Sequence, residues 1–218
     1  MKGVHTGVAM VRDAVRDAIL RGEYLPGERL VETDLIEKHG ATRFAVRSAL
    51  QDLAAEGLVE VRRHRGAHVR KVSTSEAVEI TEIRMVVEGL VASRAAERVS
   101  DGQATELDEI GALMRRAVEV ADHRRYHDLN QRLHALVRTI AGHTVADRIS
   151  ETLRGQLVRH QYTLSLLPGR PQASLPQHER IIAAIRGRDP RAAEEAMREH
   201  IASVIEALKS MEHLEARS

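Results

Sequence analysis

Residues 42–59, TRFAVRSALQDLAAEGLV, constrain the fold of this chain more than any other stretch. Apolar side chains recur at helical spacing between Val46 and Leu53, which predicts a short helix with one face in a core. Arg43 and Arg47 lie one turn apart on the opposite face, with Phe44 beside them. Two guanidinium groups and an aromatic ring on one face favour binding to an anionic partner whose hydrogen-bonding edges the side chains recognise. Two arginines on one helix are also compatible with an ordinary solvated face.

The flanking segments predict a helix-turn-helix with a wing. Residues 30–39 form a second amphipathic segment, and Gly40 supplies the flexible residue of a tight turn between two helices. After Gly57 the apolar residues alternate instead, on both sides of the basic tip RRHRG at residues 62–66. This pattern predicts two strands joined by a turn that reaches the phosphates or a second groove of DNA.

The run from Pro26 to Val69 resembles the winged helix-turn-helix of GntR-type bacterial transcription regulators. The resemblance implies binding to double-stranded DNA and makes Arg43 and Arg47 base or phosphate readers, with Phe44 packed on a thymine methyl group. The sequence departs from the family pattern at Thr42, Phe44, Ala45 and Ser48, among other positions. The DNA-binding residues implied are Thr42, Arg43, Phe44, Arg47, Arg63, His64, Arg65 and Gly66.

Composition narrows the class of protein without deciding it. The net charge is only +1, so any attraction to phosphates depends on the cluster of basic residues between Arg62 and Lys71. Cysteine is absent, which excludes disulfides and thiolate metal sites. We find neither a signal peptide nor an apolar run long enough to cross a bilayer, and we expect a cytoplasmic protein without a membrane partner.

The C-terminal part of the chain is predicted to be a helical bundle. A capping box from Ser73 to Glu76 starts a helix directly after the wing, so we expect a DNA-binding domain at 1–72 and an effector-binding and dimerisation domain at 73–218. About six helices are expected, with the later ones at 126–140, 143–166, 175–186 and 191–211. Residues 167–174 are expected to be the longest loop, because Pro168, Gly169 and Pro171 fall within them. Asp189 and Pro190 are expected to begin the last helix. The fold class is mainly α.

Three histidines differ from the others because each borders an apolar stripe on a different predicted helix. They are His134, His178 and His200, and Asn130 precedes His134 by one turn. Imidazoles that converge from facing helices form metal sites in bundles. Spacing alone equally permits hydrogen-bonded core or pocket histidines.

The same half of the chain resembles the all-helical sensing domain of the FadR subfamily, in its metal-containing branch. That pattern has an Asp and a His four residues apart, then two further histidines, and this chain has Asn130 in place of the Asp. The resemblance implies a divalent ion, Zn, Ni, Mn or Fe, held by Asn130, His134, His178 and His200. It also implies a small carboxylate or sugar-acid effector, which Arg84 clamps unless it pairs with Glu88 instead.

Two other classes of function remain as alternatives. A three-histidine site can serve a metal-dependent enzyme, but the sequence lacks HExxH, GxSxG, P-loop and GxGxxG motifs. A ligand-independent architectural DNA-binding protein has no need to line three stripes with histidine. We therefore predict a homodimeric repressor that binds a pseudo-palindromic operator and is not an enzyme.

Overall fold

The computed structural model describes residues 2–63, 65–157, 160, 163–164 and 167–215. The chain divides into two compact units: residues 1–72 with 154–158, called the winged unit, and residues 73–153 with 159–218, called the helical unit. Within the described ranges, no helix is long and apolar enough to cross a bilayer. The mainly helical fold, with a winged helix-turn-helix followed by a bundle, confirms the predicted fold class.

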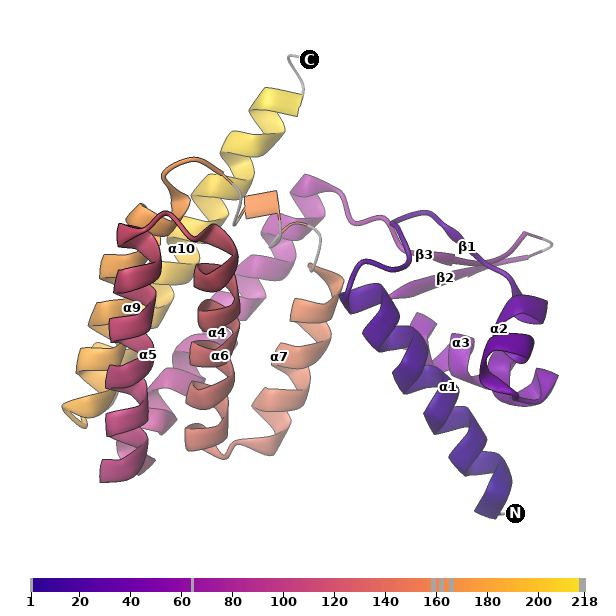
Figure 1. The fold of residues 1–218 in the computed structure, drawn as a ribbon, viewed down its shortest axis with the longest axis horizontal. Coiled ribbons are helices and arrows are strands. Elements are labelled where there is room, and N and C mark those ends of the chain that lie inside the picture. The colour runs from indigo at the N-terminus through magenta and orange to yellow at the C-terminus, as the bar shows by residue number, and fades with distance from the viewer. Residues whose placement is uncertain (1, 64, 158–159, 161–162, 165–166, 216–218) are drawn as a thin grey trace. The chain divides into compact units, whose positions relative to one another are not determined.

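The winged unit is built on the helices α1 (Lys2–Leu20), α2 (Glu32–His39) and α3 (Arg43–Ala55), which are labelled in Figure 1. Val11 and Val15 of α1 share a fully buried core with Val46 and Leu53 of α3. Gly40 ends α2 in the left-handed conformation, with φ 58°, as its place between the two amphipathic segments predicted. The helix-turn-helix is therefore confirmed.

The helix α3 is shorter than the sequence suggested. Its last residue is Ala55, whereas the apolar pattern had been extended to Val59. Gly57 has φ 73° and turns the chain, so that Leu58 is buried beyond the helix end. The apolar residues at this point fit both a helix and a strand, so the sequence pattern does not show where the helix ends. The positive φ of Gly57 separates the end of α3 from the strand that follows.

The wing is a three-stranded antiparallel sheet rather than a two-stranded ribbon. It consists of β1 (Arg29–Leu30), β2 (Val59–Arg62) and β3 (Gly66–Val69), in the order β1-β3-β2. Leu30, which we had expected in a helix, pairs with Ala67, and both side chains are buried. A two-residue strand has no periodicity of its own, so only its partner strand reveals it.

The helical unit contains long helices with clear starts. Their bounds are α4 (Thr74–Arg98), α5 (Asp101–Glu119), α6 (His123–Ala141), α7 (Thr144–Gln156), α9 (Arg170–Arg186) and α10 (Pro190–Glu215). The last three residues of α7 belong to the winged unit. The Ser73 hydroxyl accepts a hydrogen bond from the Glu76 N–H at 3.2 Å. The Asp189 carboxylate accepts one from the Ala192 N–H at 3.0 Å, which confirms the predicted start of the last helix.

Two element boundaries in this unit were predicted wrongly. The helix expected at 143–166 is interrupted, because α7 ends at Gln156 and Leu157 is a turn; residues 160, 163 and 164 are again helical, and the rest of 158–166 lies outside the described residues. The expected loop at 167–174 is mostly helix, because α9 already begins at Arg170, with Pro171 in its first turn. Proline is tolerated there because the first N–H groups of a helix have no partner within the helix. The proline pattern marks a helix start here rather than a loop.

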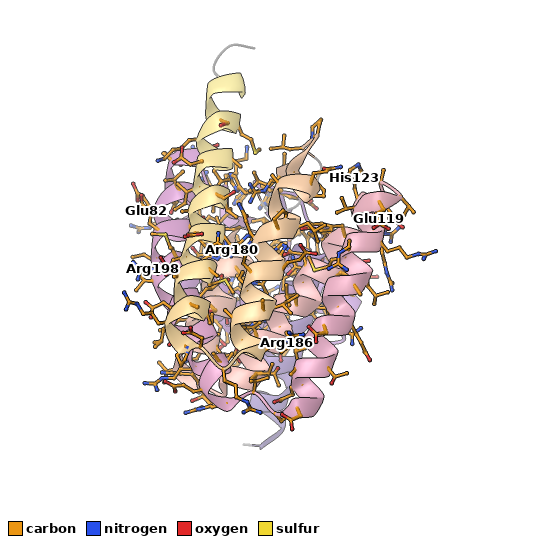
Figure 2. All side chains as sticks on the ribbon, turned by 90° about the vertical axis from the view of Figure 1, so that its left-hand side faces the viewer. Glu82, Glu119, His123, Arg180, Arg186 and Arg198 are labelled. Carbon is orange, nitrogen blue, oxygen red and sulfur yellow. The ribbon has the colours of Figure 1, made fainter. Side chains whose placement is uncertain are left out.

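The core of the helical unit lies between α4, α5, α6, α9 and α10. The backbones of α4 and α10 approach closely at Gly89, where an added Cβ would lie 2.9 Å from Cγ of Arg198. Exposed ion pairs join neighbouring helices on the outer surface, where Figure 2 labels Arg180 and Arg186. Such exposed pairs contribute little stability, so apolar packing holds the bundle together.

Candidate functional site

The first site is the exposed face of α3. Arg43, Phe44 and Arg47 are all exposed, and the Phe44 side chain leaves 65% of its surface in solvent. The buried side of the same helix carries the apolar stripe from Ala45 to Leu53, so the basic face is held outward by the core. An exposed phenylalanine between two arginines is suited to contact with base edges and methyl groups.

Thr42 and Arg47 have specific local contacts. Thr42 is the N-cap of α3, and its hydroxyl accepts a hydrogen bond from the Ala45 N–H at 3.2 Å. Arg47 Nε lies 2.9 Å and 3.0 Å from the two carboxylate oxygens of Glu32. The pair is exposed, so breaking it to free Arg47 costs little. A DNA contact by Thr42 or Arg47 stays a prediction.

The wing tip presents the other expected DNA-binding residues. Arg63 and Arg65 are exposed in the turn between β2 and β3. Gly66 has φ 80° and pairs with Arg62, which allows the tight reversal at the tip. His64 lies outside the described residues. Both guanidinium groups lie in one turn, and their contact with phosphates stays a prediction.

The second site is buried in the helical unit. His134 of α6, His178 of α9 and His200 of α10 come together, and one ring nitrogen of each lies within 4.8 Å of the others. The ring centres of His178 and His200 are 4.3 Å apart, and those of His134 and His200 are 5.5 Å apart. All three side chains are at least 95% buried. The structure thus joins three residues that are far apart in the sequence.

Two polar atoms at these residues lack the partners that buried groups normally have. Nε2 of His178 and Oδ1 of Asn130 are buried without a hydrogen bond. Buried polar atoms are nearly always satisfied, so each unpaired atom needs an explanation. Imidazole nitrogen and amide oxygen are both suitable donors to a divalent first-row ion, so the three converging histidines fit such a group, and Asn130 as a further ligand stays a prediction.

Burial disfavours the charged form of two of the three histidines. Burial lowers the pKa of His178 well below its usual value, and the charges of His134 and Arg170 lower it further. Burial likewise lowers the pKa of His200. Arg170, at the start of α9, hydrogen-bonds to the Ser203 hydroxyl at 2.8 Å. Neutral imidazoles are the form that binds metal ions.

Arg84 pairs with Glu88 within α4, which was the alternative to a free effector clamp. Its Nε and Nη2 atoms donate to Glu88 Oε1 at 2.9 Å and 2.7 Å, and both side chains are about 95% buried. The other carboxylate oxygen, Oε2, lies 3.3 Å from Nδ1 of His134. A contact between Arg84 and an effector stays a prediction. Glu88 links Arg84 to the histidine cluster, because its carboxylate contacts both Arg84 and His134.

Sequence reasoning missed the outer partners of the histidines. They are Glu88 for His134, Tyr126 for His178 at 2.9 Å, and Gln177 for His200 at 3.0 Å. One signal was available, because Tyr126 precedes Asn130 by four residues and so lies on the same face of α6. Nothing in the sequence indicated that Glu88 or Gln177 would contact a histidine, because both contacts join two different helices and depend on side-chain rotamers.

A winged helix-turn-helix with an exposed basic face, in a chain that also holds a buried polar site in a helical unit, defines a DNA-binding transcription regulator. Residues 8–69 match the bacterial regulatory proteins of the gntR family, and residues 79–203 match the FCD domain. The chain therefore belongs to the GntR family of transcription regulators.

Individual relatives agree with this family. The chain is 30% identical over 186 residues to the HTH-type transcriptional repressor RspR of Escherichia coli K12, covering 85% of this chain and 82% of RspR. It is 26% identical to the galactonate operon transcriptional repressor of the same strain, covering 88% and 93%. E. coli McbR/YncC has the same fold, with a TM-score of 0.75 at 20% identity over 94% and 98% of the two chains. RspR and the galactonate operon repressor are transcriptional repressors, and the family consists of regulators rather than enzymes, as predicted.

Proposed function

We propose that this regulator is a repressor whose binding to operator DNA is controlled by a small carboxylate or sugar acid bound beside a divalent metal ion in the helical unit. The observation that carries the proposal is the cluster of three buried histidines contributed by α6, α9 and α10. FCD domains are known to bind metals. The unpaired Nε2 of His178 and Oδ1 of Asn130 support a cation as the missing partner.

Asn130, His134, His178 and His200 would hold the ion, and Zn, Ni, Mn and Fe all suit these donors. When bound, the ion supplies a Lewis-acidic centre whose open positions accept oxygen ligands. His178 and His200 need no proton loss to bind the ion, because burial already keeps both neutral. Asn130 contributes a dipole and no charge, in contrast to the Asp of the family pattern.

The charges around the cluster favour an anionic effector. Glu88 and Arg84 neutralise one another, whereas Arg170 adds a positive charge that is felt at His178 and His200. A divalent ion held by neutral ligands increases this positive charge. A carboxylate is the complementary ligand, with Arg84 or Arg170 as its guanidinium partner. Similarity to a repressor of a galactonate operon supports the sugar-acid class.

DNA reading is assigned to the exposed face of α3 and to the wing. Arg43, Phe44 and Arg47 would contact base edges or adjacent phosphates in the major groove. Arg63 and Arg65 would bind phosphates, and their contribution would fall with rising salt. Thr42 would then act mainly through the start of α3, because its hydroxyl caps that helix.

We further propose that the regulator is a homodimer on a pseudo-palindromic operator. One short recognition helix reads few base pairs, and two-fold proteins read two-fold sites. The helix α4 offers a surface for self-association, since Ile83, Val86 and Leu90 follow one stripe and are 57%, 52% and 40% exposed. Contiguous exposed apolar residues of this kind favour a protein interface.

An architectural DNA-binding protein without an effector is the second candidate. It is disfavoured by the buried polar atoms of the cluster, because an inert bundle would be more stable with apolar residues at these positions. It predicts neither metal uptake nor a response of DNA binding to small acids.

Metal content tests the proposal. Protein purified without chelator is analysed for metals, stripped by dialysis against chelator and titrated with Zn²⁺. We expect uptake of about one equivalent per chain, and loss of uptake in His178→Ala, because three imidazoles must converge to hold the ion. His123→Ala is the matched control, since His123 is exposed at the start of α6 (Figure 2). Absence of stoichiometric uptake by the wild-type protein would overturn the metal site.

A further inference from the structure

Each histidine of the cluster uses the same ring nitrogen for an outer contact. Nδ1 of His134 faces Glu88, Nδ1 of His178 contacts the Tyr126 hydroxyl, and Nδ1 of His200 contacts Oε1 of Gln177. Nε2 is therefore the nitrogen left for the centre of the cluster. In His178 this atom is buried without a hydrogen-bond partner.

The outer partner decides where the single proton of a neutral imidazole lies. An amide oxygen and a carboxylate only accept hydrogen bonds, so Gln177 and Glu88 hold the proton on Nδ1 of their histidines. Tyr126 is different, because a phenol hydroxyl either donates or accepts. The proton position in His178 therefore depends on where the hydroxyl proton of Tyr126 points.

Ser174 supplies the missing constraint on Tyr126. This serine is 4% exposed, lies one turn before His178 on α9, and is a polar neighbour whose effect on the pKa of Tyr126 opposes that of burial. Burial raises the pKa of Tyr126, so its hydroxyl keeps its proton at neutral pH. The hydroxyl thus has one proton and two neighbours, Ser174 and His178. If it donates to His178, then Nε2–H becomes a buried donor without an acceptor.

We propose that Tyr126 is a positioning residue: it donates to Ser174, accepts from Nδ1–H of His178, and so fixes the Nε2 lone pair of His178 toward the centre of the cluster. The inference deepens the proposed metal site and rests on it, since the ion requires that lone pair. Outer partners of metal-binding histidines act in this way by setting ring orientation and tautomer. Here the tautomer of His178 depends directly on Tyr126, and on Ser174 through Tyr126.

Nitrogen NMR of the metal-free, full-length protein tests the tautomer directly. In the wild type we expect His178 to carry its proton on Nδ1. Both Tyr126→Phe and Ser174→Ala should move the proton to Nε2, the first by removing the acceptor and the second by turning the Tyr126 hydroxyl toward His178. Tyr24→Phe, the same substitution in the winged unit, should leave the His178 signals unchanged.

Zn²⁺ affinity, measured by competition with a chromophoric chelator, gives the second readout. We expect Tyr126→Phe and Ser174→Ala to weaken binding by roughly 10- to 100-fold, as is typical for outer partners of a metal ligand. Ser174→Ala keeps the assay informative if Tyr126→Phe does not fold, because it removes a single small hydroxyl.

The outcomes separate the inference from the metal site itself. A wild-type His178 that carries its proton on Nε2 would overturn the inference, as would an unchanged tautomer in both variants. A wild-type His178 protonated on Nδ1 in a protein that takes up no Zn²⁺ would support the hydrogen-bond assignment and overturn the metal site. Weaker Zn²⁺ binding together with the tautomer change supports both.

Discussion

The stability of the metal-free regulator should fall as the pH decreases from 7 to 5, and the buried histidines set the size of the effect. Burial lowers the pKa of His178 and His200 in the folded chain. Below pH ~6.5 the unfolded chain therefore binds protons that the folded chain does not, and the free energy of unfolding decreases; above this pH neither state binds them. With an unfolded pKa of about 6.5 and no protonation of the folded state, each histidine contributes about 2 kcal/mol between pH 7 and 5.

Urea unfolding in the presence of chelator, followed by helical circular dichroism at the two pH values, measures this loss. His178→Gln removes one titrating group, so its loss between pH 7 and 5 should be smaller than that of the wild type by about 2 kcal/mol. His123→Gln, at an exposed position, should keep the full loss of the wild type. Carboxylates titrate equally in all three proteins and cancel in the comparison. An unchanged pH dependence in His178→Gln would refute the conclusion that burial holds this side chain neutral.

Four further outcomes are expected. Arg47→Ala should cost about 1–3 kcal/mol on the cognate operator and less on random DNA, whereas Arg65→Ala should weaken both alike, as competition binding at fixed salt will show. Asn130→Asp should tighten Zn²⁺ binding and should lower the stability of the metal-free protein by more than about 1 kcal/mol, because the unpaired oxygen becomes a buried charge. Thr42→Ala should reduce the free energy of unfolding of the winged unit by about 1 kcal/mol through loss of the cap. Sedimentation should show a dimer that Val86→Asp dissociates, and a wild-type monomer both free and on DNA would contradict the dimer.

The sequence by itself determined the elements whose signals are local. The start of α10 at Asp189 and Pro190 and the turn at Gly40 depend on caps and backbone conformations that a few neighbouring residues specify. The apolar period of α3 likewise fixed which face carries Arg43 and Arg47, because a helix of known phase has only one buried side. The choice of three histidines also followed from their positions beside apolar stripes.

Only the tertiary structure decided how these local elements meet. The strand at Leu30 exists because β3 pairs with it, and α9 begins at Arg170 although its prolines suggested a loop. The Glu88 carboxylate of α4 contacts His134 of α6, and the Tyr126 hydroxyl of α6 contacts His178 of α9. Periodicity gives the direction of a side chain on its own helix but not the rotation of one helix against another. Packing of the whole core sets that rotation, and with it the partner of each buried polar atom.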